Sequence, residues 1–375
     1  MVINGGPGEM VVKLARSFDN FGEEDDIKLF NKVECWCFDR DQMDGLLIYS
    51  GYISGYRPVL SGGAEYIEVT LLHYISEMSQ IMLRTSNGTT EIAQNSLDPS
   101  TIAKNIIDYY QADDGQVSYT PTSVDDTNTT VSYTFNTYTT KEALDKVIEL
   151  TPQNWYWFVN ASNTFSLKLS NVNSATHSFV LGRHISDMET WRRGEDIVNR
   201  IYFIGAEDAG VNMYRVYSNT SSITSYGIHA VKYVDQRVSI AATADIMASR
   251  VMNKKKDPEI RTTIKIVDNN GENSDKGYDI ESVFPGDTMR IKNIKQGVKT
   301  ISLWDSFVWD EDVWDQTLAY AAADVIQIVS VEYHPNYIVC EASSRTPDIS
   351  KRIEDVQRNW EGTSTINAPA TPTEG

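Results

Sequence analysis

Apolar and polar residues alternate in short runs over residues 1–75, and turn-forming residues separate these runs. The four runs that predict β-strands are Met10–Arg16, Val33–Asp39, Leu46–Ile53 and Tyr66–Tyr74. Gly, Asp and Ser-Gly-Gly segments lie between them, which is typical of strand connections. Short strands at this spacing predict a small β-barrel, to which we assign residues 1–95.

After Asp98 the apolar residues recur with the period of a helix. This pattern predicts a helix at about Pro99–Gln111, with Asp98 as its N-cap. Its apolar face is formed by Ile102, Ala103, Ile106, Ile107 and Tyr110. A second helix begins at Thr139, where Glu142 three residues later completes a capping box.

The segments around the second helix are less regular. The polar stretch Asp113–Thr130 predicts a surface loop or hairpin, and Trp155–Val159 with Thr164–Leu169 predicts a hairpin across Ala-Ser-Asn. Residues 96–183 are therefore predicted to form an α+β unit inserted between β-rich segments.

Strand character returns at Ile197–Gly205 and Tyr214–Val216, and a helix follows at about Ala241–Asn253. The last β-rich runs are Ile260–Val267, Thr288–Ile291, Val325–Tyr333 and Tyr337–Ala342. Phe284–Asp287 fits a type II turn, with Pro and Gly at its centre. We assign residues 236–345 to a helix plus a second barrel, so the fold class is mainly β with an α+β insertion.

The end of the sequence predicts a helix at 346–360 and a mobile tail at 361–375, which is rich in Ser, Thr and Pro. In the helix, Ile349, Ile353, Val356 and Trp360 are spaced four, three and four apart, as in a coiled-coil seam. The stripe is shorter than the three to four heptads of an established coiled coil. Two interpretations follow, a helix docked on its own barrel or a contact between protomers, and we take these four residues as candidate interface residues.

The net charge and the N-terminal sequence disfavour several classes of function. The 375 residues carry a formal net charge of −19, which disfavours nucleic acid and anionic membranes as partners because both are polyanionic. Residues 1–30 contain no long apolar stretch, so we expect no signal peptide and no membrane anchor, and synthesis in a bacterial cytoplasm.

No catalytic, cofactor-binding or metal-binding residues are assigned from the sequence. The five histidines never fall within four residues of one another, and Cys35, Cys37 and Cys340 lie in strand-like runs without the setting of a reactive thiol. The acidic stretch 304–315 lacks the glycine of an EF-hand loop. Gly5-Gly6-Pro7-Gly8 precedes a strand rather than a helix, so we interpret it as a flexible N-terminal arm or turn. The 52 acidic residues make a carboxylate pair uninformative about glycoside hydrolysis.

Several segments, in their order along the chain, resemble the baseplate hub proteins of bacteriophage tails, including the structural N-terminal part of tail-associated lysozymes. They are Leu47–Ile53 (LIYSGYI), Glu68–Leu72, Glu195–Tyr202 (EDIVNRIY) with Gly205, Asp257–Ile260 (DPEI) and Pro285–Thr288 (PGDT). None of them is a catalytic signature. The resemblance covers most of the chain and implies two small barrels per subunit, with the first barrel completed by strands at about 184–235.

The resemblance further implies a homotrimer whose six barrels form a ring in the virion, at the tip of the tail, joining the distal tail to the tip and lining the DNA exit channel. The partners it implies are the distal tail protein, the tape-measure protein and the tip or receptor-binding proteins. We therefore expect a structural protein without enzymatic activity or sequence-specific nucleic-acid binding. A receptor-binding tail adhesin, with exposed Tyr and Trp for saccharides, is the first alternative, and a peptidoglycan hydrolase is the second.

Overall fold

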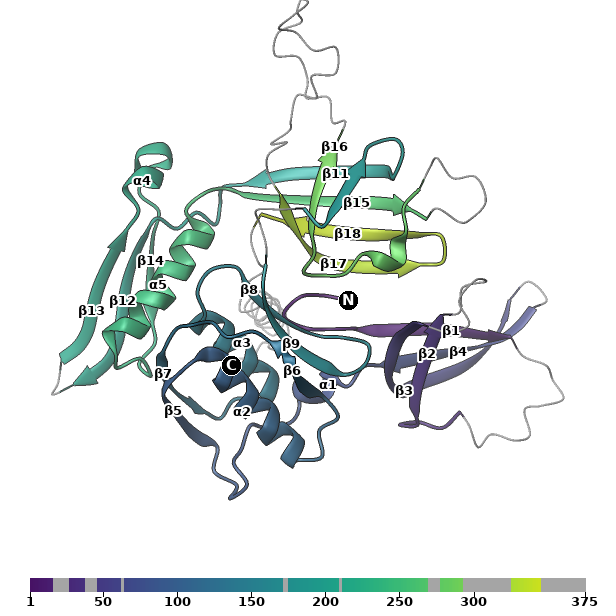
Figure 1. Ribbon diagram of the computed structural model, residues 1–375, viewed down its shortest axis with the longest axis horizontal. Coiled ribbons are helices and arrows are strands. Elements are labelled where there is room, and N and C mark those ends of the chain that lie inside the picture. Colours follow the sequence, from purple (N-terminus) through teal and green to yellow (C-terminus); the bar gives the residue numbers. More distant parts are fainter. Residues whose placement is uncertain are drawn as a thin grey trace, which may run out of the picture.

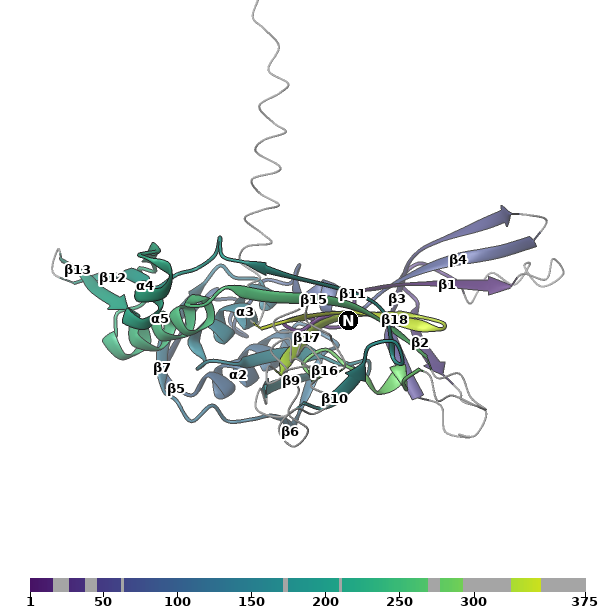
Figure 2. The same cartoon turned by 90° about the horizontal axis from the view of Figure 1, so that it is seen from above.

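The computed structural model describes residues 1–15, 27–37, 46–61, 64–170, 175–208, 211–268, 277–292 and 325–344. The predicted fold class is confirmed, because the chain is mainly β, with an α+β unit and two curled sheets. Figures 1 and 2 show an elongated molecule with a four-stranded sheet at one end and a three-stranded sheet at the other. The α+β unit and a six-stranded sheet lie between these two ends.

The four-stranded sheet is antiparallel throughout. Its strands, in spatial order, are β1 (Glu9–Ala15), β4 (Ala64–Leu72), β3 (Leu46–Ser61) and β2 (Lys32–Cys37). Alternate residues of β4, namely Ile67, Val69 and Leu71, are buried on its inner face. At Gly51 the neighbouring strand passes so close that an added Cβ would lie 2.2 Å from the Leu72 carbonyl oxygen, so only glycine fits there.

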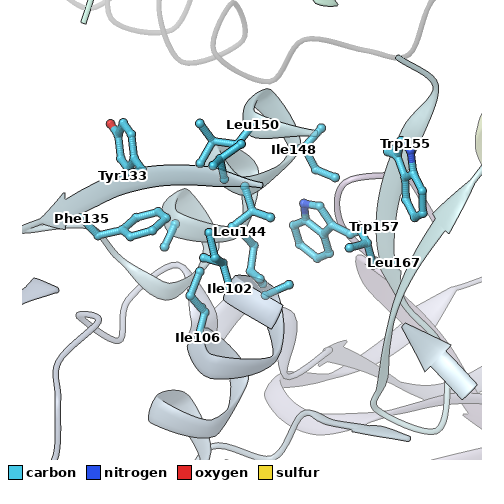
Figure 3. Packing of buried hydrophobic residues seen from close by; sticks show 14 of the residues in the cluster. Ile102, Ile106, Tyr133, Phe135, Leu144, Ile148, Leu150, Trp155, Trp157 and Leu167 are labelled. Atoms are coloured by element: carbon cyan, nitrogen blue, oxygen red, sulfur yellow. The ribbon is translucent and has the colours of Figure 1, made fainter. Parts of the chain in front are cut away.

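The α+β unit follows the short helix α1 (Ile75–Met78). It contains β5 (Glu91–Leu97), α2 (Pro99–Ala112), β6 (Ser118–Val124), β7 (Val131–Asn136), α3 (Thr140–Leu150), β8 (Trp155–Val159) and β9 (Thr164–Leu169). Strands β5 and β7 pair with each other, and β9 lies between β6 and β8. Figure 3 shows how the apolar faces of α2 and α3 pack with these strands, with Leu144 near Ile102 and Trp157.

Both predicted helix starts of this unit are confirmed. The Asp98 side chain accepts a hydrogen bond from the Ser100 amide, and Thr139 and Glu142 make the reciprocal capping-box bonds. The predicted hairpin is also confirmed as β8 and β9, with its bounds unchanged. The loop or hairpin predicted for 113–130 needs correction, because its residues 118–124 form β6, which pairs parallel with β9. Distant pairing overrides the polar composition of this stretch.

The six-stranded sheet joins segments far apart in sequence. Its spatial order is β10 (His177–Val180), β16 (Thr288–Lys292), β17 (Ile326–His334), β18 (Tyr337–Ser343), β15 (Glu259–Val267) and β11 (Ile185–Arg193). The two edge strands, β10 and β11, are consecutive and are linked by a bridge between Leu181 and Ile185, so the sheet curls toward closure. The predicted type II turn leads into β16, with Gly286 at φ +99° and the Asp287 amide 3.2 Å from the Phe284 carbonyl oxygen.

The remaining strands form a separate sheet. Strand β12 (Arg200–Asp208) pairs antiparallel with β13 (Val211–Ser218) and parallel with β14 (Ala230–Val234), and α4 (Thr220–Tyr226) connects β13 to β14. The helix predicted at about Ala241–Asn253 is confirmed as α5 (Ala241–Lys255), which ends in Lys254 and Lys255. This pairing corrects the expectation that strands at about 184–235 complete the first barrel. Within the described residues, β11 bonds to β15, and β12–β14 bond to one another.

Residues 2–6 are not a flexible arm in this structure. The Ile3 amide donates to the Val329 carbonyl of β17, and the Asn4 amide donates to the Trp157 carbonyl of β8. Ile3 is 1% exposed and packs with Tyr156 and Val329. The segment therefore ties the six-stranded sheet to the α+β unit.

Candidate interaction surfaces and buried polar clusters

The candidate interface residues Ile349, Ile353, Val356 and Trp360 lie outside the described residues, as do the predicted helix 346–360, the tail 361–375 and the acidic stretch 304–315. Their predicted roles stay predictions. The candidate surfaces below are therefore built from residues that the structure describes.

One face of the β12–β14 sheet carries apolar residues that no described part of the chain covers. Neighbouring residues of paired strands project on the same side, so Ile204 of β12 stands between Tyr214 of β13 and Val234 of β14, and Tyr202 stands beside Val216. Tyr214 is 60% exposed, and Val216 and Val234 are each 50% exposed. We call these five residues the open face.

The opposite face of the same sheet is covered by α5. Ile201 and Phe203 alternate with the open-face residues of β12, are fully buried, and pack in one core with Ala244 and Met247 of α5. The sheet is thus a two-layer structure with apolar residues on both faces but a described helix on only one. Strands with two apolar faces are typical of a sheet that is covered on both sides.

A second exposed apolar group lies at the other end of the molecule. Leu60 near the end of β3 is 71% exposed, Tyr56 is 49% exposed, and Leu14 of β1 is 42% exposed. Figure 2 shows β3 and β4 extending beyond the rest of the described chain at this end. The neighbouring residues Arg57 and Glu68 form an ion pair at 2.6 Å.

His177, Tyr278 and Asp287 form a linear polar cluster that the sequence analysis did not find. The His177 Nε2 is 3.1 Å from the Asp287 Oδ2, and its Nδ1 is 3.0 Å from the Tyr278 hydroxyl. His177 lies 101 residues before Tyr278 and 110 before Asp287, and the pairing of β10 with β16 brings it to them. No local spacing could have revealed the cluster.

The same cluster resembles a hydroxyl–imidazole–carboxylate triad in connectivity only. Burial raises the pKa of the Tyr278 hydroxyl, which makes it a poorer nucleophile near neutral pH. The Asp287 carboxylate also accepts from the Phe284 amide inside the type II turn, and the imidazole stacks on Phe179. These contacts fix the turn and the start of β16, which is a structural role.

Lys146 of α3 is held by two carboxylates where the α+β unit meets the β12–β14 sheet. Its Nζ lies 2.7 Å from the Asp235 Oδ2 and 2.8 Å from the Glu149 Oε2, and the Tyr233 hydroxyl donates to Glu149 at 3.0 Å. Burial alone would lower the pKa of Lys146, but Glu149 and the other neighbours raise it above its usual value. A raised pKa keeps the ammonium protonated at neutral pH, which suits a fixed ion pair rather than proton transfer.

A cavity of about 130 Å³ lies beside this joint and is lined by Glu149, Tyr233, Arg250 and Lys254 among others. The Glu149 carboxylate is already occupied by Lys146 and Tyr233. Arg250 donates to Thr151, Pro152 and Trp155. With these groups committed to the protein itself, the cavity does not present a free binding group from either residue.

The other buried titratable groups also favour structural roles. Burial raises the pKa of the Cys340 thiol to about 12, so this thiol stays protonated. Cys35 is half-buried, and burial raises its pKa too. Among the described residues no group of His, Cys, Asp and Glu is arranged to hold a metal ion.

None of the helices in the described part of the chain is long and apolar enough to cross a membrane.

The fold resembles that of solved tail proteins. The prophage MuSo2 43 kDa tail protein from Shewanella oneidensis shares 12% identity with this chain, with a TM-score of 0.53, over 90% of this chain and 88% of that one. A tail protein from Neisseria meningitidis MC58 shares 11% identity, also with a TM-score of 0.53, over 91% of this chain and 99% of that one. No family model matches the sequence, and no curated protein matches it.

Proposed function

We propose that this protein is a structural component of a bacteriophage tail, a baseplate hub that forms a trimeric ring at the tail tip. The observation that carries the proposal is the likeness of fold to two tail proteins, which extends over about nine tenths of the chain. In the proposed ring each subunit contributes two curled sheets, and the ring joins the distal tail to the tip and lines the DNA exit channel.

The buried polar clusters support a role that is geometric rather than catalytic. The His177 cluster fixes a turn, and the Lys146 cluster joins two units. Neither presents an activated nucleophile. We therefore propose no enzymatic activity, and partners that are other tail proteins: the distal tail protein, the tape-measure protein and the tip or receptor-binding proteins.

The experiment is the mass and shape of the purified protein. Three chains of 42.2 kDa give about 127 kDa, which sedimentation at micromolar concentration separates clearly from the monomer. Images of the same sample should show three-fold rings. A chain that stays monomeric at every concentration tested, and in tail particles occupies no ring, would contradict the proposal.

The two alternative functions have their own readouts on the same sample. An adhesin would bind host glycans as an isolated protein, and a hydrolase would clear peptidoglycan in a zymogram. We expect neither glycan binding nor clearing.

A further inference from the structure

We propose that the open face of the β12–β14 sheet is covered by the C-terminal segment of a neighbouring copy of this chain, through Ile349, Ile353, Val356 and Trp360. The inference rests on the proposed ring and identifies one contact that would hold it together. It starts from the five exposed or half-exposed apolar residues of the open face, which the described part of the chain leaves in contact with water.

The apolar character of the open face makes it a docking surface. Tyr214 and Val216 of β13 and Val234 of β14 are each at least half exposed, and they lie on either side of Tyr202 and Ile204 of the central strand β12. Single exposed apolar residues are common on proteins, whereas a contiguous group on one sheet face marks a contact. Two cations project on the same face: Lys232 stands beside Tyr202, and Arg200 lies two residues before Tyr202 along β12.

The place where the described chain ends supplies the occupant. The Ser344 amide donates to the Ile260 carbonyl, and the Ile260 amide donates to the Ser344 hydroxyl, so the chain leaves the six-stranded sheet where β15 begins. The start of β15 follows the end of α5 closely in sequence. At the end of α5, the Lys255 carbonyl accepts a hydrogen bond from the Val198 amide, which lies just before β12. The segment after Ser344 therefore starts at the corner next to the β12–β14 sheet.

The segment matches the open face in length and apolar content. Ile349 follows Ser344 by five residues, which span at most about 17 Å when extended. The four apolar residues then recur through Trp360 with the spacing of one helix face. A helix carrying them would give the sheet a second layer opposite α5, so that both apolar faces are covered.

The contact is assigned to a neighbouring copy because a closed ring needs head-to-tail contacts, in which each copy offers one surface and receives a different one. Each chain has one such segment and one open face, so three exchanged segments fill three faces. Exchange of an element between identical chains is an inexpensive route to such an assembly.

The test uses two full-length variants and a matched control. Tyr214→Asp places a charge in the open face, and Ile353→Asp places one in the segment. Ile228→Asp changes a residue that is 59% exposed, close to the 60% of Tyr214, but lies outside the sheet between α4 and β14. We expect the first two variants to sediment as monomers, with association weakened at least about tenfold, and Ile228→Asp to form the wild-type trimer. Circular dichroism should show all three folded.

Mixing the two defective variants separates a neighbour contact from a contact within one chain. In the mixture, the intact segment of Tyr214→Asp can dock on the intact face of Ile353→Asp, so we expect a two-chain species. A mixture that remains monomeric would overturn the inference, as would trimers formed by either variant alone.

Two C-terminal deletions and the wild-type chain serve as further controls. Removing 361–375 should leave the trimer intact, while removing 345–375 should abolish it, and a trimer that survives the longer deletion would overturn the inference. If the variants fail to change a wild-type trimer, the proposed contact is wrong but the ring stands. If the wild-type chain forms no trimer, the proposed function fails.

Discussion

Arg250 lies in α5 and is 7% exposed, yet its guanidinium is well supplied with acceptors. It donates to the Thr151 hydroxyl at 2.8 Å and to the carbonyl oxygens of Thr151 and Trp155 at 3.3 Å, and it also contacts the Pro152 carbonyl at 2.5 Å. These acceptors follow the end of α3, so the side chain fastens α5 to the α+β unit. Its removal would leave buried carbonyl groups without a donor.

Arg250→Met should therefore lower the free energy of unfolding by about 2–4 kcal/mol, because buried acceptors lose charge-assisted bonds that water cannot replace. The matched control is Arg215→Met, which breaks an exposed ion pair with Asp245 at 2.8 Å. Exposed pairs contribute little. Urea unfolding should thus show a clearly larger loss for the Arg250 variant, and equal losses would contradict the assigned role.

His73 is 1% exposed and lies where the four-stranded sheet meets the α+β unit. Its Nδ1 accepts from the Ile75 amide, and its buried Nε2 makes no hydrogen bond of good geometry with the described residues. Burial lowers the pKa of this imidazole from 6.5 to about 4, and the nearby Asn160 carbonyl only partly opposes the shift. The folded chain therefore holds His73 neutral at a pH where the unfolded chain protonates it.

The difference in the pKa of His73 between the folded and unfolded states sets the sign of the pH dependence of stability. Between pH 6.5 and about 4 the unfolded state binds more protons at His73, so acidification destabilises the folded state, by roughly 3 kcal/mol once the pH is below both values. Burial raises the pKa of Asp145 to about 6, which acts in the opposite direction over part of this range. The effect of His73 must therefore be isolated by comparison.

His73→Phe retains a ring of similar size without a titrating group. We expect the stability of the wild type relative to this variant to fall as the pH is lowered from 7 to 4, measured by urea unfolding at each pH. His229→Phe, at an exposed position, serves as the control and should show no comparable trend. A parallel pH dependence in wild type and His73→Phe would contradict the burial argument.

Residues with local roles were predictable from the sequence, whereas residues with distant partners were not. Asp98 and Thr139 cap helices through bonds to residues two or three positions away, and Gly286 serves a four-residue turn. His177 finds Tyr278 and Asp287 only after β10 pairs with β16. Arg250 likewise depends on the packing of α5 against the α+β unit.

The same distinction holds for elements. Helices α2, α3 and α5 and the hairpin of β8 and β9 follow from periods and caps that a short window contains. Strand β6 was expected to be loop or hairpin because Ser, Thr and Pro dominate it, and its position is set by β9. The grouping of β10 and β11 with β15–β18 also depends on pairing over long separations, which no local pattern encodes.

Residues 2–6 are the clearest case of an element defined by its partners. Their glycine-rich composition suggests flexibility, yet the Ile3 side chain is fully buried between the six-stranded sheet and β8. The Asn4 side chain accepts from the Trp157 amide at 3.1 Å. This segment contributes to holding the two units in a fixed orientation.

Ile3→Ala should lower the free energy of unfolding by about 2–4 kcal/mol, as for other buried large-to-small changes. Val11→Ala in β1 is the control, because Val11 is 49% exposed and its truncation opens no cavity. Chemical denaturation with fluorescence detection measures both. A loss at Ile3 no greater than at Val11 would show that the segment does not connect the units.

At the scale of the whole molecule, two groups of exposed apolar residues lie on strands at its two ends, on the β12–β14 sheet and on β1 and β3 (Figure 1). A cyclic assembly with head-to-tail contacts needs two different surfaces on each subunit. The sequence resemblance supplied the ring as an expectation. The position of the two exposed surfaces could not be predicted from the sequence. The exposure of Tyr214 or Leu60 depends on which strands lie at the edge of a sheet and on which face of the sheet a helix covers.

The net charge also acts at this scale. Each chain carries −19, so the three chains of the proposed ring would carry −57, and we expect part of that charge to face its bore. DNA in such a bore would be repelled from the wall, whereas a wall lined by Lys and Arg would bind it through counterion release. Charge spread over the outer surface would instead serve solubility.

We predict that the purified ring does not retain duplex DNA even at about 10 mM salt, where the Debye length is roughly 30 Å and attraction would be strongest. The physical reason is that the net negative charge of the ring repels polyanionic DNA. Gel-shift or filter-binding measurements across a salt series check this, with a basic DNA-binding protein as the positive control. Retention that weakens as salt is added would mean a net-positive bore, and the ring would then bind the DNA rather than let it slide.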